Sequence, residues 1–390
     1  GPAIEQLQAR FDPRAYRIDV SQAPLMRAFV AYDAACDKWI LLVLTHHLAD
    51  DNTTQSLIVS EIREILAGRE PAASQLPFRN FVAQARQGVS RAEHETFFRT
   101  MLGDVDEPTM PFGLSDTRGE GRPVGQTTRD LDAAVLQRLR AQARRLGVSV
   151  ASLCHLAWGL VLARVSGRDD VVFGTVLFGR MQSGEGSDRA MGLFINTLPM
   201  RLQIDDVTVE AGVRRTHALL AELLHHEHAS LALAQRCSAV AAPAPLFTSL
   251  LNYRHSRSGK TSPKEVIRAL GGVEWLSAHE RTNYPLGFAV NDWTFGMTLA
   301  VQVQDTLDPE RVMCFAETAL LRLVDALEIE PTRPLHAIDV LPEPERQLVV
   351  ETWNATDAPY PVDRLVHEWF EAQAAKTPDA IALVQDEASL

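Results

Sequence analysis

The sequence predicts a mixed α/β protein of the α+β layer type, and two observations support this. Helical and extended patterns alternate along most of the 390 residues, with apolar side chains recurring at periods near 3.6 and 2. The hydrophobic fraction of 46% and the charged fraction of 23% are typical of a globular protein with a sizeable core. A chain of this length is expected to form one large two-lobed domain or two to three ordinary ones.

An early strand pattern runs directly into a histidine pair. Residues 39–44 are the apolar run Trp-Ile-Leu-Leu-Val-Leu, and residues 45–52 then read Thr-His-His-Leu-Ala-Asp-Asp-Asn. We expect a helix from near Thr53, because Leu57, Ile58, Ile62 and Leu66 fall on one helical face. The glycine-, aspartate- and proline-rich stretch 103–124 is predicted to be a long connection.

Helices and strands alternate in the middle of the chain. A helix over 133–146 should end at Gly147, and Ser149 should cap a buried, nearly all-apolar helix over 150–165. Strands are expected near 127–131, 170–176, 197–202, 246–253 and 296–303. The proline-punctuated segment from Pro331 to Pro344 is typical of a linker, and a short helix is expected over 343–350.

Charge and cysteine usage exclude several classes of protein. The formal net charge of −12 argues against a nucleic-acid or anionic-membrane partner. No apolar stretch has the length of a membrane span, and no signal peptide is visible. The four cysteines have neither metal-site nor redox spacing, which predicts a reducing, cytoplasmic location. They are Cys36, Cys154, Cys237 and Cys314.

The octet 45–52 is the strongest candidate for chemistry. On an extended strand His46 and His47 would point in opposite directions, so they would make a poor pair of metal ligands. Asp50 is predicted to be a solvated loop carboxylate, and Asp51 to lie at a helix start, where the helix dipole favours a negative charge. Asn52 is a good N-cap candidate and would form a capping box with a glutamine three residues later.

Other polar clusters have simpler interpretations. The run His225-His226-Glu227-His228 lacks the spacing of a His-Glu-x-x-His zinc site, so we predict a polar helix end and no metal. Asn196, Asn252 and Tyr253 could line a cleft, although such strand residues usually satisfy backbone groups. No Gly-x-Ser-x-Gly nucleophile motif is present, so a covalent acyl-enzyme is not indicated.

Four segments together resemble one known family. The octet resembles the His-His-x-x-x-Asp-Gly motif of nonribosomal peptide synthetase condensation domains, with Asn52 in place of the glycine. Residues 191–201, Met-Gly-Leu-Phe-Ile-Asn-Thr-Leu-Pro-Met-Arg, resemble the Gly-x-Phe-x-Asn-Thr…Arg segment of that family. Residues 172–174 and 178–180 are similar to the segment before it, and residues 283–285 resemble the late Asn-Pro motif with one residue inserted.

The resemblance implies a two-lobed, V-shaped chloramphenicol-acetyltransferase-like fold, with the octet at the floor of a channel between the lobes. Residues 1–115 would be the N-terminal lobe, incomplete because the family's early motifs are absent, and residues 116–335 the C-terminal lobe. Residues 336–365 would be a linker, and residues 366–390 resemble the start of an adenylation domain.

The same resemblance implies the chemistry. The amine of an acceptor aminoacyl-carrier would attack the thioester of a donor acyl- or peptidyl-carrier, with His47 as the general base or amine-positioning residue. His46, Asp51 and Asn52 would be structural, with Asp51 in an ion pair with either Arg180 or Arg201.

The implied partners are upstream donor and downstream acceptor carrier proteins, with the adenylation domain in the same chain. Their phosphopantetheine arms would enter the site, and no cofactor or metal would be bound directly.

Several variants stay open at this stage. Within the family, the domain could be a starter that takes a fatty-acyl donor for a lipopeptide, or a dual domain that also epimerises the donor residue. A catalytically silent module that only docks carrier proteins belongs to another class, and its expected mark would be loss of His47 or Asp51. A free-standing acyltransferase is less consistent with the adenylation-like tail.

Overall fold

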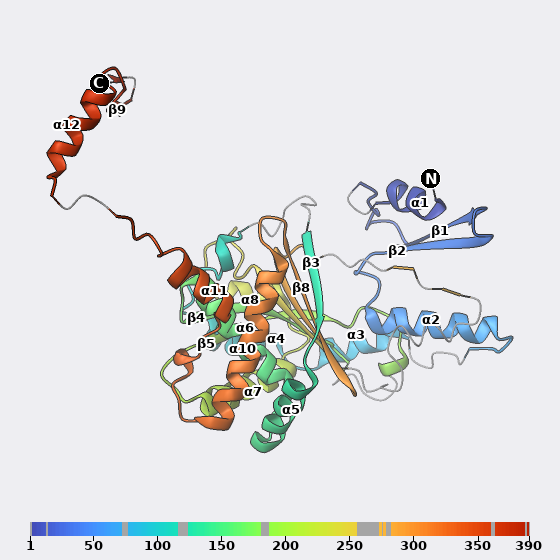
Figure 1. Ribbon diagram of the computed structural model, residues 1–390. Helices are drawn as coiled ribbons and strands as arrows, with labels where there is room; N and C mark the ends of the chain where they lie inside the picture. The colour runs from blue at the N-terminus through green and yellow to red at the C-terminus, as the bar shows by residue number, and fades with distance from the viewer. Residues whose placement is uncertain are drawn as a thin grey trace. The chain divides into compact units, whose positions relative to one another are not determined.

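The computed structural model (Figure 1) describes residues 2–12, 15–71, 77–115, 124–180, 187–255, 273–274, 276–277, 282–359, 363–386 and 388–389. The chain divides into two compact units, Gly1–Leu341 and Pro342–Leu390. The division falls inside the predicted linker, and both predicted lobes lie in the first unit.

A six-stranded sheet forms the centre of the first unit. Its strand order is β3-β8-β7-β6-β4-β5, and the β4–β6 and β6–β7 pairs are parallel while the others are antiparallel. The strands are β3 (Val124–Asp130), β4 (Asp170–Leu177), β5 (Asn196–Gln203), β6 (Ser249–His255), β7 (Leu286–Trp293) and β8 (Gly296–Gln304). The five predicted strands are confirmed. Strand β7 was not predicted, although its alternate residues are buried as in a half-buried strand.

Four helices pack on one another and against this sheet (Figure 1). They are α5 (Ala133–Leu146), α6 (Val150–Ser166), α7 (Val209–His225) and α10 (Pro309–Ile329). As predicted, α5 ends at Gly147, whose φ is +67°, and the Ser149 hydroxyl caps α6 by accepting from the Ser152 N–H at 3.2 Å. Because α6 is apolar nearly all round, it has no polar face to turn toward solvent. Its residues 152–163 are all buried.

Two polar side chains of α6 are satisfied inside the core. The Trp158 Nε1–H donates to Ser249 Oγ at 3.2 Å, and its ring stacks on Phe288 with centroids 4.8 Å apart. His155 Nε2 lies 2.7 Å from Thr175 Oγ1, and its Nδ1 lies 2.7 Å from the Ala151 carbonyl oxygen. Burial lowers the pKa of His155 to about 4, because charging a ring removed from water is unfavourable.

The first hundred residues form smaller elements. Strands β1 (Met26–Asp33) and β2 (Lys38–Thr45) pair antiparallel, and helix α1 (Ala3–Arg10) contacts both. Phe11 stacks on Phe29 of β1 with ring centroids 3.5 Å apart. Helices α2 (Asn52–Leu66), α3 (Phe78–Gln87) and α4 (Arg91–Leu102) follow.

One face of the β1–β2 hairpin is apolar and exposed. The cross-strand pairs Ala28–Val43, Val30–Leu41 and Tyr32–Trp39 lie on this face, and the Trp39 side chain is 73% exposed. A contiguous apolar patch is typical of a surface that another chain segment or protein covers.

The second unit contains α11 (Glu343–Gln347), a π-helical turn at Leu348–Thr352, α12 (Val366–Lys376) and a short pair of strands, β9 (Val384–Gln385) and β10 (Ala388–Ser389). The short helix predicted over 343–350 is therefore confirmed at its start. The remaining described elements of the first unit are α8 (Leu231–Arg236) and short 3₁₀ turns at Pro111–Gly113, Ser187–Arg189 and Leu335–Ala337.

No single helix in the described part of the chain is both long and apolar enough to cross a membrane. Helices α5 and α6 pass such a test only as a pair, with a 110° bend between them.

Trp158→Ala should lower the free energy of unfolding by about 3–5 kcal/mol, because it empties a fully buried site and leaves Ser249 without its donor. Urea denaturation followed by far-UV circular dichroism measures the change. Trp39→Ala is the matched control, and its expected loss is much smaller because that ring is exposed. Equal losses for the two variants would contradict the assignment of α6 as the core helix.

The lowered pKa of His155 makes stability depend on pH. The unfolded histidine titrates near 6.5 and the folded one near 4, so the unfolded state binds more protons between these values. Stability is therefore greatest above pH 6.5 and falls as the pH drops toward 4. The contribution of His155 should fall by about 2 kcal/mol between pH 7 and 5. His155→Gln should flatten this slope in urea titrations, and an unchanged slope would rule out His155 as its source.

Candidate active site

The histidine pair lies in a turn that follows β2. The strand ends at Thr45, the Ala49 N–H donates to the His46 carbonyl at 2.9 Å, and the Leu48 N–H donates to His46 Nδ1 at 3.1 Å. The expectation that both histidines continue the strand and alternate across it is therefore wrong, because these local hydrogen bonds turn the chain. His46 is half-buried and His47 is exposed, so the two rings still have different surroundings.

The His47 ring is oriented by its own loop. Its Nδ1 lies 3.2 Å from the backbone carbonyl oxygen of Asp50. A carbonyl oxygen only accepts, so Nδ1 carries the hydrogen in this contact and the neutral ring has its lone pair on Nε2. That tautomer leaves Nε2 as the basic nitrogen.

Asp51 is buried and densely bonded. Its Oδ1 accepts from the Thr54 N–H at 2.9 Å and lies 3.1 Å from Thr54 Oγ1. Arg180 Nη2 donates to both carboxylate oxygens, at 2.9 and 3.0 Å, and the Phe194 N–H donates at 3.2 Å. Asp51 thus joins the loop after β2 to the segment that follows β4.

Asp51, and not Asn52, caps helix α2. Asp51 has an extended backbone, with φ −130° and ψ 174°, and its side chain reaches the Thr54 N–H. Asn52 is already the first helical residue and is exposed, so the predicted capping box is wrong. Gln55 instead points its amide toward Thr45 Oγ1 and Asp50 Oδ2, at 3.4 Å each.

Both terminal nitrogens of Arg180 are hydrogen-bonded, while its buried Nε has no partner among the described residues. Its Nη1 donates to the carbonyls of Ser187 and Ala190, and its guanidinium lies 3.9 Å above the centroid of the Phe194 ring. Phe194 also belongs to a small apolar cluster with Phe81, Ala190 and the partly buried Phe78. This cluster packs α3 against the arginine segment.

Gly192 lets the arginine segment approach α2 and α3. Its φ is +150°, and a Cβ there would lie 2.3 Å from the Phe78 ring. The Gly192 carbonyl oxygen accepts from the Thr54 hydroxyl at 2.9 Å, and the Gly192 N–H donates to the Thr54 hydroxyl oxygen at 3.0 Å. Only glycine fits this position without displacing α3.

Asp50 is buried, which corrects the expectation of a solvated carboxylate. The residue is only 2% exposed. Burial is the largest influence on its pKa and raises it; Asp51 raises it further, while the Gln55 amide and His47 lower it.

Arg201 lies in a different ion-pair network. Its guanidinium binds Asp170 and Asp104, and its Nη1 donates to the Met101 carbonyl at 2.9 Å. Of the two arginines that the sequence left open, the structure therefore pairs Arg180 with Asp51. Arg201 links β4 and β5 to the end of α4.

The three candidate lining residues all bond to protein groups. Asn196 Nδ2 donates to the carbonyls of Glu227 and Ala229, at 2.9 and 2.6 Å. The Asn252 amide oxygen, in its satisfied orientation, accepts from Arg254 Nε at 3.1 Å. The Tyr253 hydroxyl donates to Asp292 at 2.6 Å. Their role in lining a channel stays a prediction.

The histidine-rich run lies at the end of α7, which finishes at His225. His226 is buried, its Nδ1 lies 2.8 Å from His94 Nδ1, and Phe97 stacks on its ring. Burial lowers the pKa of both paired rings. Within the described ranges, no three histidine, cysteine or acidic side chains are arranged to hold a metal ion.

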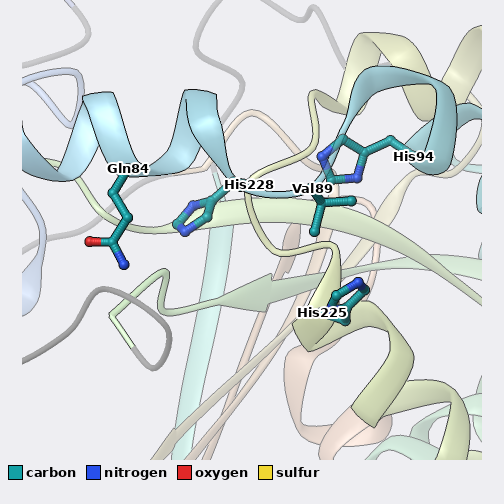
Figure 2. Close-up of a pocket in the computed structure, with 6 residues that line it drawn as sticks. Gln84, Val89, His94, His225 and His228 are labelled. Carbon is teal, nitrogen blue, oxygen red and sulfur yellow. The ribbon is translucent and has the colours of Figure 1, made fainter.

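A pocket lies beside His94 of this pair (Figure 2). A second pocket is lined partly by Phe247, Asn283 and Tyr284. His47 lines neither pocket. The residues of the first pocket are Gln84, Gly88, Val89, His94, His225 and His228.

Solved structures identify the class of fold. The chain aligns with a four-domain nonribosomal peptide synthetase solved with AMP and glycine at a TM-score of 0.74, covering 99% of this chain and 31% of that one at 14% identity. It aligns with the condensation domain of the Monacolin K polyketide synthase at a TM-score of 0.63, covering 86% of this chain and 79% of that one at 18% identity. These matches confirm the chloramphenicol-acetyltransferase-like fold class.

The sequence comparisons identify the family. The model of the "Condensation domain" family matches residues 3–350, so the chain belongs to the condensation domains of nonribosomal peptide synthetases. It is 49% identical over 393 residues to malpinin synthetase of Mortierella alpina, covering the whole chain and 5% of that relative. It is 46% identical over 390 residues to malpibaldin synthetase of the same organism, covering the whole chain and 7% of that relative.

A more distant relative is bacitracin synthase 3 of Bacillus licheniformis, 25% identical over 385 residues, which covers 96% of this chain and 6% of that protein. The chain therefore spans only a small part of the length of the curated relatives it matches.

Arg180→Ala should lower the free energy of unfolding by about 3–5 kcal/mol, because it leaves the buried Asp51 carboxylate without its ion-pair partner. The double variant Arg180→Ala/Asp51→Asn should lose less than the sum of the single losses. Arg69→Ala, which breaks an exposed pair with Glu64, is the control and should have no measurable effect. Additive losses in a double-mutant cycle followed by urea denaturation would contradict the coupling.

Proposed function

We propose that this domain forms an amide bond between two carrier-bound substrates. The acceptor amine attacks the donor thioester, the C–N bond forms and the C–S bond breaks. His47 Nε2 takes the proton that the attacking nitrogen loses, and the proton then passes to the departing thiolate. The observation that supports this most is the exposed His47 ring, held by the Asp50 carbonyl in the tautomer that leaves Nε2 basic.

Positioning contributes more to this reaction than proton transfer. A well-placed general base gives about 10²–10⁴-fold. Alignment of two tethered reactants is worth about 7–11 kcal/mol in favourable cases. His47 accordingly acts both as the proton acceptor and as the group that aligns the amine.

Asp51 and Arg180 act through His47 as positioning residues. Their buried ion pair fixes the start of α2, and the loop that carries His47 ends at this point. Arg180 Nη2 donates to both Asp51 oxygens, and this charge-assisted contact holds the loop in place. Asp51 is not a nucleophile in this scheme, because Arg180 and two other residues occupy its oxygens.

The partners in this proposal are an upstream donor carrier and a downstream acceptor carrier, each with a phosphopantetheine arm. No cofactor is held by the domain itself. Residues 366–390 would begin a neighbouring adenylation domain in the same cytoplasmic chain. Relatives in which the matching region is only 5–7% of the length support a multidomain setting.

The lobe that carries His47 has an uncovered apolar hairpin face, which supports the proposal that residues 1–115 are part of a larger N-terminal lobe. The proposal also includes a substrate channel between the two lobes, with His47 at its floor. Starter and dual variants would share the chemistry at His47 and differ in the donor.

His47→Ala should abolish amide formation and leave the fold unchanged, because an exposed turn residue contributes little to stability. Single-turnover assays of the full-length synthetase, with loaded donor and acceptor carriers and intact-protein mass spectrometry of the acceptor, measure the product. His367→Ala, another exposed histidine, is the control and should retain full activity. Undiminished product from His47→Ala would refute the role assigned to His47.

A further inference from the structure

Two adjacent carboxylates are buried beside the candidate base, and only one of them is compensated. Asp51 accepts hydrogen bonds from Thr54, Arg180 and Phe194. Asp50 is just as buried, yet no described residue bonds to its Oδ1, and its Oδ2 has only the Gln55 amide at 3.4 Å. A buried carboxyl with an open oxygen is costly to the fold, so a benefit to function is the natural explanation.

Asp50 is tied to His47 in two ways. Its backbone carbonyl accepts from His47 Nδ1 at 3.2 Å, so the two residues close a single turn. Burial raises the pKa of the Asp50 side chain most, and the charge of a protonated His47 lowers it. By reciprocity, an ionised Asp50 makes the protonated form of His47 more favourable.

Other charged groups near this turn do not replace Asp50. Asp51 is neutralised by its pair with Arg180 from the segment after β4. Gln55 of α2 is uncharged, and His46 Nδ1 is occupied by the Leu48 N–H. Among the described residues around the turn, Asp50 is therefore the buried carboxyl group that lacks a cationic partner.

We propose that Asp50 is a positioning and charge-balancing residue for His47, with its carbonyl setting the ring tautomer and its carboxylate stabilising the imidazolium formed during amide synthesis. The proton moves from the attacking nitrogen to His47 Nε2, and the imidazolium then faces a buried negative charge. When the proton leaves with the thiolate, Asp50 returns to its uncompensated state. This role rests on the proposed function of His47.

The test is Asp50→Asn in the full-length synthetase, since asparagine keeps the shape and removes the charge. The acid limb of the pH–rate profile should move to lower pH by about 0.5 unit, because His47 loses a group that favours its proton. The plateau rate should fall by about 3- to 10-fold, because the ring becomes a weaker base. The KM for the acceptor carrier should not change, and the midpoint of unfolding should be equal or higher, because a buried uncompensated charge is gone.

Glu70→Gln is the matched control, because it removes one negative charge from an exposed site in the same lobe. Its profile should coincide with that of the wild type. An unmoved acid limb in Asp50→Asn, or a change confined to KM or to thermal stability, would overturn the proposal.

Two further variants separate this inference from the assignment of His47. If His47→Ala is inactive while Asp50→Asn has the wild-type pH profile, only the role of Asp50 fails. If His47→Ala is active, the proposed function of His47 is rejected, and the role of Asp50 that rests on it is rejected with it. In the His47→Ala background, Asp50→Asn should cause no further loss of the residual rate, and an additional loss would mean that Asp50 acts independently of the ring.

Discussion

The candidate site depends on one buried ion pair, between Asp51 and Arg180. The two residues are separated by 129 positions in the sequence, and neither side chain is more than 10% exposed. Because an unpaired buried charge is strongly unfavourable, the pair brings the loop after β2 and the segment after β4 to one place. Packing supports it from outside, since the Phe194 ring lies under the guanidinium and against the aromatic residues of α3, and Gly192 allows the close approach.

Asp50 and Asp51 show how two identical neighbours acquire different roles. Helix-start hydrogen bonds and a guanidinium satisfy one carboxylate, so it stabilises the loop. The other is removed from water without comparable partners and influences the adjacent imidazole. The difference lies in their partners, since Arg180 reaches Asp51 and no described cation reaches the Asp50 side chain in an ion pair.

Elements with strong local signals could be predicted from the amino-acid sequence. Gly147 and Ser149 mark the boundary between α5 and α6, and the continuous apolar run identifies α6 as the core helix, because these effects act within a few residues. Four short segments, the octet and residues 191–201 among them, together carried the resemblance to the family. Strand β7 was missed although its alternating pattern was present, since short apolar runs are weak signals on their own.

Three features of the site could be read only from the folded chain: which arginine meets Asp51, which residue caps α2, and whether Asp50 is solvated. Each of these depends on groups distant in the chain or on the direction in which a turn points. Arg180 and Arg201 are the same type of residue. Their positions after β4 and within β5 decide which aspartate each one meets. Local periodicity fixes which residues form an element, whereas long-range packing fixes which charges meet.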